Sequence, residues 1–371
     1  MSSQLQQKYY YPQLNALRGI GIISVFLYHS YKPQFGTSFL MKFAAFCYEN
    51  IYLSMDMFFA LSAFIITHLA FIEIDKNGYF SFKNFMIRRI LRIWPIYFII
   101  LAISYIAVKK IAFHYNIPIT LPPASWYVFF VSNFYLEGHV FFLRQLWTIS
   151  VEEQFYIVWG ICLLTINKRI KLILIIAIFC IISITFNFYN AFGTNNVYYH
   201  SLTYLFDLMC GAYFAHLIHK KAKIIKYISS PSFFKSLALY LFLPIFFLVY
   251  FFLNNMVTGT LNNILDVIMR IIFIIHQCII FVDQMYNVNS FFNLSKRRFL
   301  IYVGKIAYGV YCFHGLILTA GFLFISKQSI QINPFLFALI MFGITLLVGT
   351  ISYKFIEKPI INLKYRLPQK R

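Results

Sequence analysis

The chain has 371 residues, of which 61% are hydrophobic and only 12% are charged. Because a soluble domain usually has about a quarter charged residues, this composition excludes an ordinary water-soluble fold and predicts an integral membrane protein. The net charge of +21 would suit a nucleic-acid-binding protein, but the distribution of the cations described below argues against that function.

Ten apolar stretches each have close to the length of about 20 residues that an α-helix needs to cross a bilayer. The sequence therefore predicts an all-α integral membrane protein, a bundle of about ten transmembrane helices around a polar central cavity. Residues 1–371 are expected to form a single transmembrane domain with no additional soluble domain. The predicted spans are residues 13–31, 52–73, 93–109, 147–166, 171–189, 201–218, 236–253, 264–283, 301–325 and 334–355.

The first predicted span carries two ionisable residues, Arg18 and His29, inside an apolar run. The eleven steps between them return to within about 20° of the same helix face, so both side chains lie on one stripe, roughly 16 Å apart along the axis. Ionisable groups in membrane helices usually face a polar cavity. The pattern predicts a cavity with a fixed cation at one level and an imidazole at another. The alternative is an Arg18 that reaches the interface and a His29 that bonds a neighbouring helix.

Three arginines, Arg88, Arg89 and Arg92, precede the third span or lie at its beginning, on the side predicted to be cytoplasmic. Arg89 and Arg92 are three residues apart and therefore share a helix face. Guanidinium groups bind phosphate oxygens through pairs of hydrogen bonds, so the cluster suits a polyphosphate ligand. The alternative is ordinary flanking charge that sets the orientation of the span.

Five of the eleven acidic residues lie within predicted spans and not at their terminal residues, namely Asp56, Glu152, Glu153, Asp207 and Asp266. A carboxylate in such a position needs a partner or a function. Glu152 and Glu153 are adjacent in the fourth span, and their side chains point about 100° apart, so only one of them is expected to line the cavity. The sequence leaves open which one it is. Asp56 in the second span is a further candidate for the cavity.

Two more ionisable residues lie near the C-terminal end of the chain. His314, in the ninth span, is interpreted as a structural hydrogen-bonding residue rather than a second base. Glu357 lies at the end of the tenth span, where the helix dipole disfavours a carboxylate, so a cationic partner is expected from the arginine cluster at positions 88, 89 and 92.

The cations are concentrated on one side of the predicted bundle. If the N-terminus is cytoplasmic, 23 of the 32 lysines and arginines fall in inner segments and six in outer loops. This distribution follows the positive-inside rule and predicts that both termini are cytoplasmic. The positive charge therefore reports membrane topology, with anionic lipid as a secondary partner and no nucleic acid. The six cysteines have no paired spacing with one another or with histidine, so no metal site is predicted.

Six sequence elements, in order from residue 14 to residue 360, resemble the acyltransferase-3 family of integral membrane acyltransferases. That family O-acetylates bacterial surface sugars and related acceptors. Three positions depart from the family pattern: Ala63 replaces a glycine, Tyr204 an arginine and Gly315 a tryptophan, and the last two leave the acceptor open. The elements are the Arg18–His29 pair, SMDMFFALSAF, RRILRIWPIY, WTISVEEQFY, YGVYCFH and ISYKFIEKP.

The resemblance implies a membrane O-acyltransferase of the bacterial cytoplasmic (inner) membrane, an O-acetyltransferase. It would move an acyl group from cytosolic acyl-CoA, with acetyl-CoA as the expected donor, to a hydroxyl of a surface or lipid-linked carbohydrate on the outer side. It also implies that His29 is catalytic, with Arg18 as its partner, and that Arg89 and Arg92 hold the acyl-CoA. The remaining residues expected at the site are Asp56, Glu152 and Glu153 on the catalytic side and Arg88 on the donor side.

Two questions stay open at this level. His29 suits either of two roles, a general base on the acceptor hydroxyl or a transient acyl carrier. A transporter or flippase of a lipid-linked sugar or an anion would use the same buried residues without acyl chemistry, and N-acylation of an amino sugar is a third function that they would serve. The lack of internal repeats and the phosphate-suited arginines favour the acyltransferase.

Overall fold

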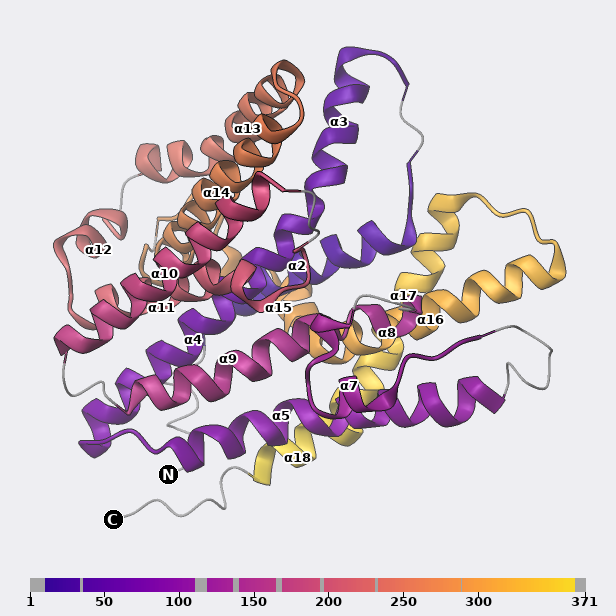
Figure 1. Ribbon diagram of the computed structural model, residues 1–371, viewed down its shortest axis with the longest axis horizontal. Helices are drawn as coiled ribbons and strands as arrows, with labels where there is room; N and C mark the ends of the chain where they lie inside the picture. Colours follow the sequence, from indigo (N-terminus) through magenta and orange to yellow (C-terminus); the bar gives the residue numbers. More distant parts are fainter. Residues whose placement is uncertain are drawn as a thin grey trace.

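The structure is a computed structural model that describes residues 11–33, 36–110, 119–135, 140–164, 169–193, 197–230, 233–287 and 289–363. All regular elements in these ranges are helical, as Figure 1 shows. The two ends that the sequence predicts to be cytoplasmic, residues 1–10 and 364–371, lie outside the described residues.

The α-helices follow one another along the chain with short connections. The structure describes four 3₁₀ segments between them: η1 (Asn50–Tyr52), η3 (Ser132–Phe134), η4 (Ser201–Tyr204) and η5 (Leu294–Lys296). Two π-helical segments, η2 (Ile103–Val108) and η6 (Tyr353–Glu357), extend α5 and α17. The α-helices are α2 (Pro12–Ser30), α3 (Phe39–Glu49), α4 (Leu53–Asn77), α5 (Phe82–Ala102), α7 (Ala124–Val128), α8 (Phe141–Arg144), α9 (Trp147–Leu163), α10 (Arg169–Ala191), α11 (Leu205–His219), α12 (Lys223–Ile228), α13 (Phe233–Met256), α14 (Thr260–Tyr286), α15 (Arg298–Lys305), α16 (Ala307–Gln328), α17 (Pro334–Ser352) and α18 (Lys358–Asn362).

Eight helical segments in the described part of the chain are long and apolar enough to cross a membrane. The predicted all-α, multi-pass membrane protein is therefore confirmed, although the predicted number of ten spans is not exact. The two predicted spans that are not among the eight form α2 and α9. α9 has only 17 residues, and α2 contains Arg18, His29 and other polar residues that lower its mean hydropathy. These two helices carry four of the expected site residues.

Two predicted spans differ most from the helices of the structure. The third begins at Phe82 rather than at residue 93, because the helix continues through the cationic turns that contain Arg88, Arg89 and Arg92. The ninth is divided at Ile306, where α15 ends and α16 begins. The division allows α15 and α16 to contact different parts of the bundle.

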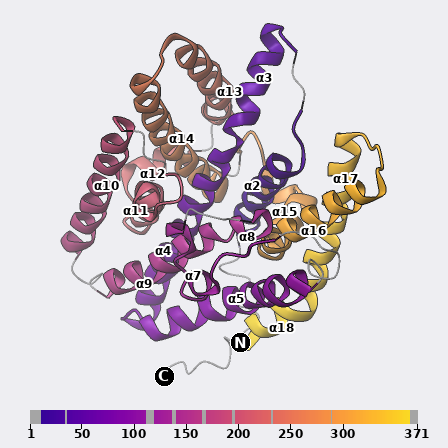
Figure 2. The same ribbon diagram turned by 45° about the vertical axis from the view of Figure 1, so that its right-hand side comes forward.

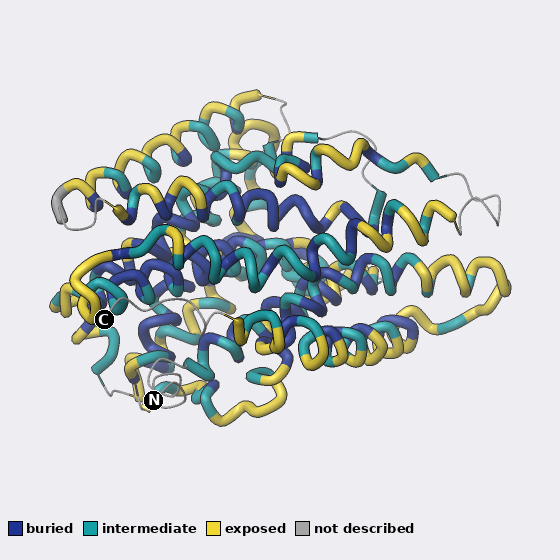
Figure 3. Tube along the Cα trace, turned by 90° about the horizontal axis from the view of Figure 1, so that it is seen from below, coloured by how far each residue is buried: buried dark blue, intermediate teal, exposed yellow. Residues whose placement is uncertain are grey.

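The surface of the bundle is apolar where it would meet lipid. In Figure 3 the buried segments lie mainly in the interior of the bundle, and long exposed stretches follow the outer helices. Leu174 and Ile181 on α10 and Phe234 and Ile245 on α13 are among the exposed large apolar side chains. Lipid tails are as apolar as these side chains, so a bilayer accommodates a surface that water would not.

α4 lies between two groups of helices, as Figures 1 and 2 show. One side of α4, with Phe59 and Ala63, packs into a core shared with α5 and α9. Its other side, with Leu61 and Phe64, packs into a second core shared with α2, α11 and α14. Several polar residues, among them Arg18, Arg89 and Glu152, lie where α2, α4, α5, α9, α15 and α16 meet.

Glycines allow two pairs of helices to approach closely. A Cβ atom at Gly19 on α2 would overlap the carbonyl oxygen of Leu300 on α15, and a Cβ atom at Gly304 would overlap that of Asn15. Gly211 on α11 approaches α4 in the same way. Small residues permit such backbone contacts between membrane helices, and the contact between α2 and α15 fixes the position of the neighbouring Arg18.

Candidate active site

A cavity of about 110 Å³ lies between α2, α4, α5, α9, α15 and α16. Its lining combines apolar and aromatic side chains with a small number of polar groups, which is the usual composition of a small-molecule site. The polar and charged side chains in the lining are Arg18, Ser62, Arg89, Arg92, Thr148, Glu152, Tyr156, Tyr308 and Tyr311.

Three arginines from two helices meet at this cavity, Arg18 from α2 and Arg89 and Arg92 from α5. Arg89 and Arg92 lie on one face of α5 because they are three residues apart. None of the three forms an ion pair with a residue that the structure describes. The cavity therefore presents three guanidinium groups whose charge the described side chains do not neutralise by direct contact.

Arg89 is the most buried of these arginines, with a relative exposure of 8%. Its guanidinium lies 5.6 Å from the ring centroids of both Phe85 and Tyr156, and its buried Nε atom has no hydrogen-bond partner among the described residues. A buried donor without a partner is unfavourable unless a ligand or water completes it. The geometry around Arg89 is therefore suited to an anionic ligand.

Glu152 contributes a carboxylate to the lining, whereas Glu153 is absent from it. The hydroxyl of Tyr156 donates to Glu152 Oε2 at 3.0 Å and lies 2.8 Å from Ser62 Oγ. Glu153 is turned away, and its Oε2 accepts a hydrogen bond from Trp94 Nε1 at 3.2 Å. The structure thus shows which of the two adjacent glutamates faces the cavity.

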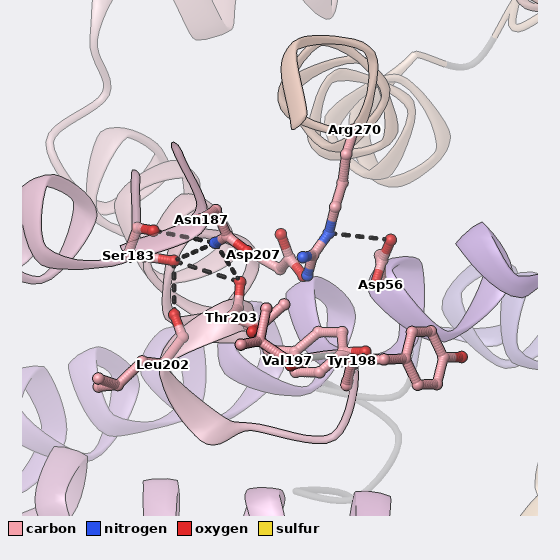
Figure 4. Close-up of polar contacts among 10 residues, drawn as sticks. Asp56, Ser183, Asn187, Val197, Tyr198, Leu202, Thr203, Asp207 and Arg270 are labelled. Atoms are coloured by element: carbon pink, nitrogen blue, oxygen red, sulfur yellow. Dashed lines mark hydrogen bonds and ion pairs between the residues drawn. The ribbon is translucent and has the colours of Figure 1, made fainter. Parts of the chain in front are cut away.

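Four of the eight expected site residues, Arg88, Asp56, Glu153 and His29, are absent from the cavity lining, and two of them, Arg88 and Asp56, form ion pairs elsewhere. Arg88 forms an ion pair with Glu73 at 2.6 Å. Asp56 on α4 forms an ion pair with Arg270 on α14, with 3.1 Å between Arg270 Nε and Asp56 Oδ2. Arg270 also pairs with Asp207 on α11, so the three residues connect three helices, as Figure 4 shows. This geometry supports a structural role for Asp56 rather than contact with the cavity.

His29 lies near the C-terminal end of α2, beyond the cavity lining, and contacts His314 on α16. The distance from His29 Nδ1 to His314 Nε2 is 3.2 Å, and the ring planes are inclined by 21°. Phe141 lies edge-on to the His29 ring, with centroids 5.8 Å apart. Three elements of the chain therefore hold the imidazole of His29.

Tyr311 connects the cavity to the histidine pair. Its hydroxyl lies in the cavity lining, 2.7 Å from Thr148 Oγ1, and donates to the carbonyl of Gln145 at 2.6 Å. Its own carbonyl oxygen accepts a hydrogen bond from His314 Nδ1 at 2.5 Å. One residue of α16 thus touches both the arginine cavity and the group that contacts His29.

Sequence reasoning missed several of these contacts. It treated His314 as structural and did not place it beside His29, 285 residues away. It did not bring Arg18 together with Arg89 and Arg92, and it did not single out Tyr156 or Tyr311 in the lining. The sequence did contain a signal for His314 and Tyr311, because both belong to the YGVYCFH element.

The cationic partner expected for Glu357 is not found among the described arginines. Glu357 accepts a hydrogen bond from Ser352 Oγ at 3.0 Å, and no ion pair joins it to a described arginine.

No cluster of three or more histidine, cysteine or acidic side chains in the described ranges is arranged to hold a metal ion. Guanidinium groups bind an anion, and an imidazole at the far end of α2 can accept or donate a proton. Together these groups suit binding of an anionic compound and proton transfer near it.

Comparison with known proteins gives a consistent result. Residues 11–354 match the profile of a protein family described as "Acyltransferase domain". A Staphylococcus aureus (strain COL) protein named "Putative O-acetyltransferase" is 26% identical over 372 aligned residues, which cover 94% of this chain and 57% of the relative. The peptidoglycan O-acetyltransferase OatA of Listeria monocytogenes serovar 1/2a is 24% identical over 383 aligned residues, covering 95% of this chain and 56% of the relative.

The chain thus spans a little more than half the length of these curated relatives. No solved structure matches the chain.

Proposed function

The chain belongs to the acyltransferase-3 family, and from this premise we propose that it transfers an acetyl group from cytosolic acetyl-CoA to a hydroxyl of a carbohydrate. The observation that carries the proposal is the cavity in which Arg18, Arg89 and Arg92 have no ion-pair partner among the described residues. A membrane protein that leaves three arginines without carboxylate partners at one cavity is suited to an anion.

Acetyl-CoA supplies such an anion, because its phosphate groups are negatively charged and guanidinium groups bind phosphate oxygens in a bidentate manner. Arg89 and Arg92 are the proposed phosphate contacts. Arg18 shares their cavity from α2, so it is suited to the same anion or to the thioester-bearing arm. The positive-inside distribution supports a cytosolic position for this donor.

His29 is the proposed general base. It takes the proton from the acceptor hydroxyl as the hydroxyl oxygen attacks the acetyl carbonyl carbon. A new C–O ester bond forms and the C–S thioester bond breaks, so the CoA sulfur leaves with the bonding electron pair. The proton on His29 then passes to that sulfur, which gives free CoA thiol and restores the neutral imidazole. No oxidant, reductant or metal enters this balance.

The acceptor proposal rests on the relatives and on topology. The Listeria relative is named for peptidoglycan, which contains carbohydrate. For this chain we propose only the class of acceptor, a hydroxyl of a carbohydrate. His29 lies eleven residues after Arg18 on α2, roughly 16 Å farther along the helix. With the proposed cytoplasmic N-terminus, the base would lie toward the outer side, where a surface or lipid-linked glycan would enter.

The direct test uses the purified full chain in lipid nanodiscs with acetyl-CoA and a lipid-linked glycan. Release of free CoA thiol and acetylation of the glycan, detected by mass spectrometry, are the expected results. His29→Ala should lower the rate by about 10²–10⁴-fold while acetyl-CoA binding is retained. The control is His219→Ala, because His219 pairs with Asp75 away from the cavity and should keep its rate.

Binding or movement of acetyl-CoA without thiol release would contradict the proposal and favour a transporter. Near-normal acetylation by a well-expressed His29→Ala variant would remove His29 from the mechanism.

A further inference from the structure

The contact between His29 and His314 has a defined direction. His314 Nδ1 lies 2.5 Å from the carbonyl oxygen of Tyr311, one turn earlier on α16. A carbonyl oxygen can only accept a hydrogen bond, so Nδ1 of His314 must carry the proton. In the neutral imidazole the other nitrogen, Nε2, is then an acceptor, and it is this atom that faces His29.

The same reasoning fixes the proton on His29. Since Nε2 of a neutral His314 accepts, Nδ1 of His29, 3.2 Å away, must donate. A neutral His29 that carries its proton on Nδ1 has its lone pair on Nε2. The hydrogen bond made by one ring nitrogen determines whether the other nitrogen carries the proton. The series of hydrogen bonds from Tyr311 through His314 to His29 therefore selects a single tautomer of His29.

From this chain of hydrogen bonds we propose that His314 is a positioning residue that keeps the Nε2 atom of His29 unprotonated and available as the base. The inference deepens the proposed function, on which it rests for the identity of the base. When His29 accepts the acceptor's proton at Nε2, its Nδ1–H bond to His314 is retained, so the imidazolium forms without a change of partner.

The surroundings of His314 make it suited to this role. The side chain is almost fully buried, with a relative exposure of 1%, and both of its nitrogens have partners. The next residue is Gly315, where a Cβ atom would come within 2.8 Å of Gln145 Oε1. The glycine therefore lets the segment with Gln145 approach α16, and the carbonyl of Gln145 accepts the hydroxyl of Tyr311.

Two substitutions of His314 separate a positioning role from a merely structural one. In His314→Asn, the side-chain amide occupies the place of Nδ1 and keeps the bond to Tyr311, but it does not reach His29. In His314→Gln, the longer side chain places its amide near the position of Nε2, where its oxygen can accept from His29 Nδ1. Each variant therefore keeps one of the two contacts of His314 and loses the other. His314→Asn keeps the contact with Tyr311, and His314→Gln keeps the contact with His29.

The activity measurement compares CoA release by the wild type and both variants in nanodiscs, with acetyl-CoA affinity measured in parallel. We expect His314→Asn to lower kcat by about 10–100-fold and His314→Gln to retain substantially more activity, with donor affinity unchanged in both. Equal activity of the two variants, or a higher activity of His314→Asn, would overturn the positioning role.

A second measurement reads the tautomer without any turnover. The protein is labelled with ¹⁵N-histidine, and the His29 signals are assigned by their loss in His29→Ala. The expected ¹⁵N shifts show a proton on Nδ1 and none on Nε2 of His29, with this preference lost in His314→Asn. A proton on Nε2 in the wild type would refute the inference. A wild-type protein with the expected tautomer but no acetyl transfer would instead refute the proposed function.

Discussion

Buried arginines occur in two regions of this bundle, and their partners differ. On α14, Arg270 pairs with Asp56 and with Asp207, and its guanidinium also lies 4.5 Å from the ring centroid of Tyr204. At the cavity, Arg18, Arg89 and Arg92 have no ion pair with any described residue. In the first region the guanidinium is paired with two carboxylates of the protein, whereas in the second three guanidinium groups have no such partner among the described residues.

The difference separates a structural from a ligand-binding use of the same residue type. Arg270 joins α4, α11 and α14, and both carboxylates beside it are buried, so its contacts hold the helices together (Figure 4). The cavity arginines Arg18, Arg89 and Arg92 join no helices through ion pairs among the described residues. They are suited to an anion that arrives from outside the protein, and this distinction leads to predictions for each region.

The largest effect is expected for Arg270→Leu. Removal of the guanidinium leaves the carboxylates of Asp56 and Asp207 buried without their cation, and breaking a buried pair in this way costs about 3–5 kcal/mol. The free energy of unfolding, measured by denaturant titration of the detergent-solubilised protein, should fall by that amount. The triple variant Arg270→Leu, Asp56→Leu, Asp207→Leu should recover most of the loss, because it buries no charge. A stable single variant would show that Arg270 is not a structural connection.

The second effect is on the donor rather than on stability. Arg89→Ala with Arg92→Ala should weaken acetyl-CoA binding at least tenfold, which corresponds to about 1.4 kcal/mol, because charge-assisted hydrogen bonds to phosphate are lost. Lysine at both positions should restore binding only in part, since an ammonium keeps the charge without the planar fork. Isothermal titration in nanodiscs measures all three proteins. Full rescue by lysine would mean that these arginines serve only the orientation of the helix.

The sequence was sufficient for the fold class but not for the contacts between helices. Apolar stretches of spanning length predicted most of the helices, because their signal is local. α2 and α9 are not among the eight helices that are long and apolar enough to cross a membrane, because α9 has only 17 residues and the polar residues of α2, Arg18 and His29 among them, lower its mean hydropathy. The angle between adjacent residues predicted that only one of the two glutamates would face the cavity. Which one does so depends on the rotation of α9 in the bundle, and local sequence does not contain that angle.

The partners of individual residues depend on packing between distant segments. Asp56 was a candidate for the catalytic cavity, but its partner Arg270 is 214 residues away on α14. His314 contacts His29 because α16 packs beside α2, although 285 residues separate them in the chain. A single sequence shows that such polar residues in membrane helices require partners. It does not show which helices bring those partners together.

A smaller effect, of opposite sign, is expected for Glu152→Gln. The substitution keeps an acceptor for the hydroxyl of Tyr156 and removes a negative charge from the lining of the cavity. Acetyl-CoA affinity should rise by about fivefold, corresponding to about 1 kcal/mol of relieved repulsion in a partly solvated site. Glu153→Gln is the matched control, since Glu153 is turned toward Trp94, and its donor affinity should stay within about twofold of wild type. Weaker binding by Glu152→Gln would show that the carboxylate itself contacts the donor.

The smallest effect is expected for Arg88→Ala, and it tests whether pairing distinguishes the two kinds of arginine. Arg88 is the immediate neighbour of Arg89 on α5, but its guanidinium is paired with Glu73 and its side chain is 33% exposed. A partly exposed pair of this kind contributes about 0–1 kcal/mol to stability. Acetyl-CoA affinity should therefore change by less than about twofold, whereas Arg89→Ala alone should weaken it clearly. Equal losses in the two single variants, measured by the same titration, would mean that the absence of an ion-pair partner does not determine which arginine binds the donor.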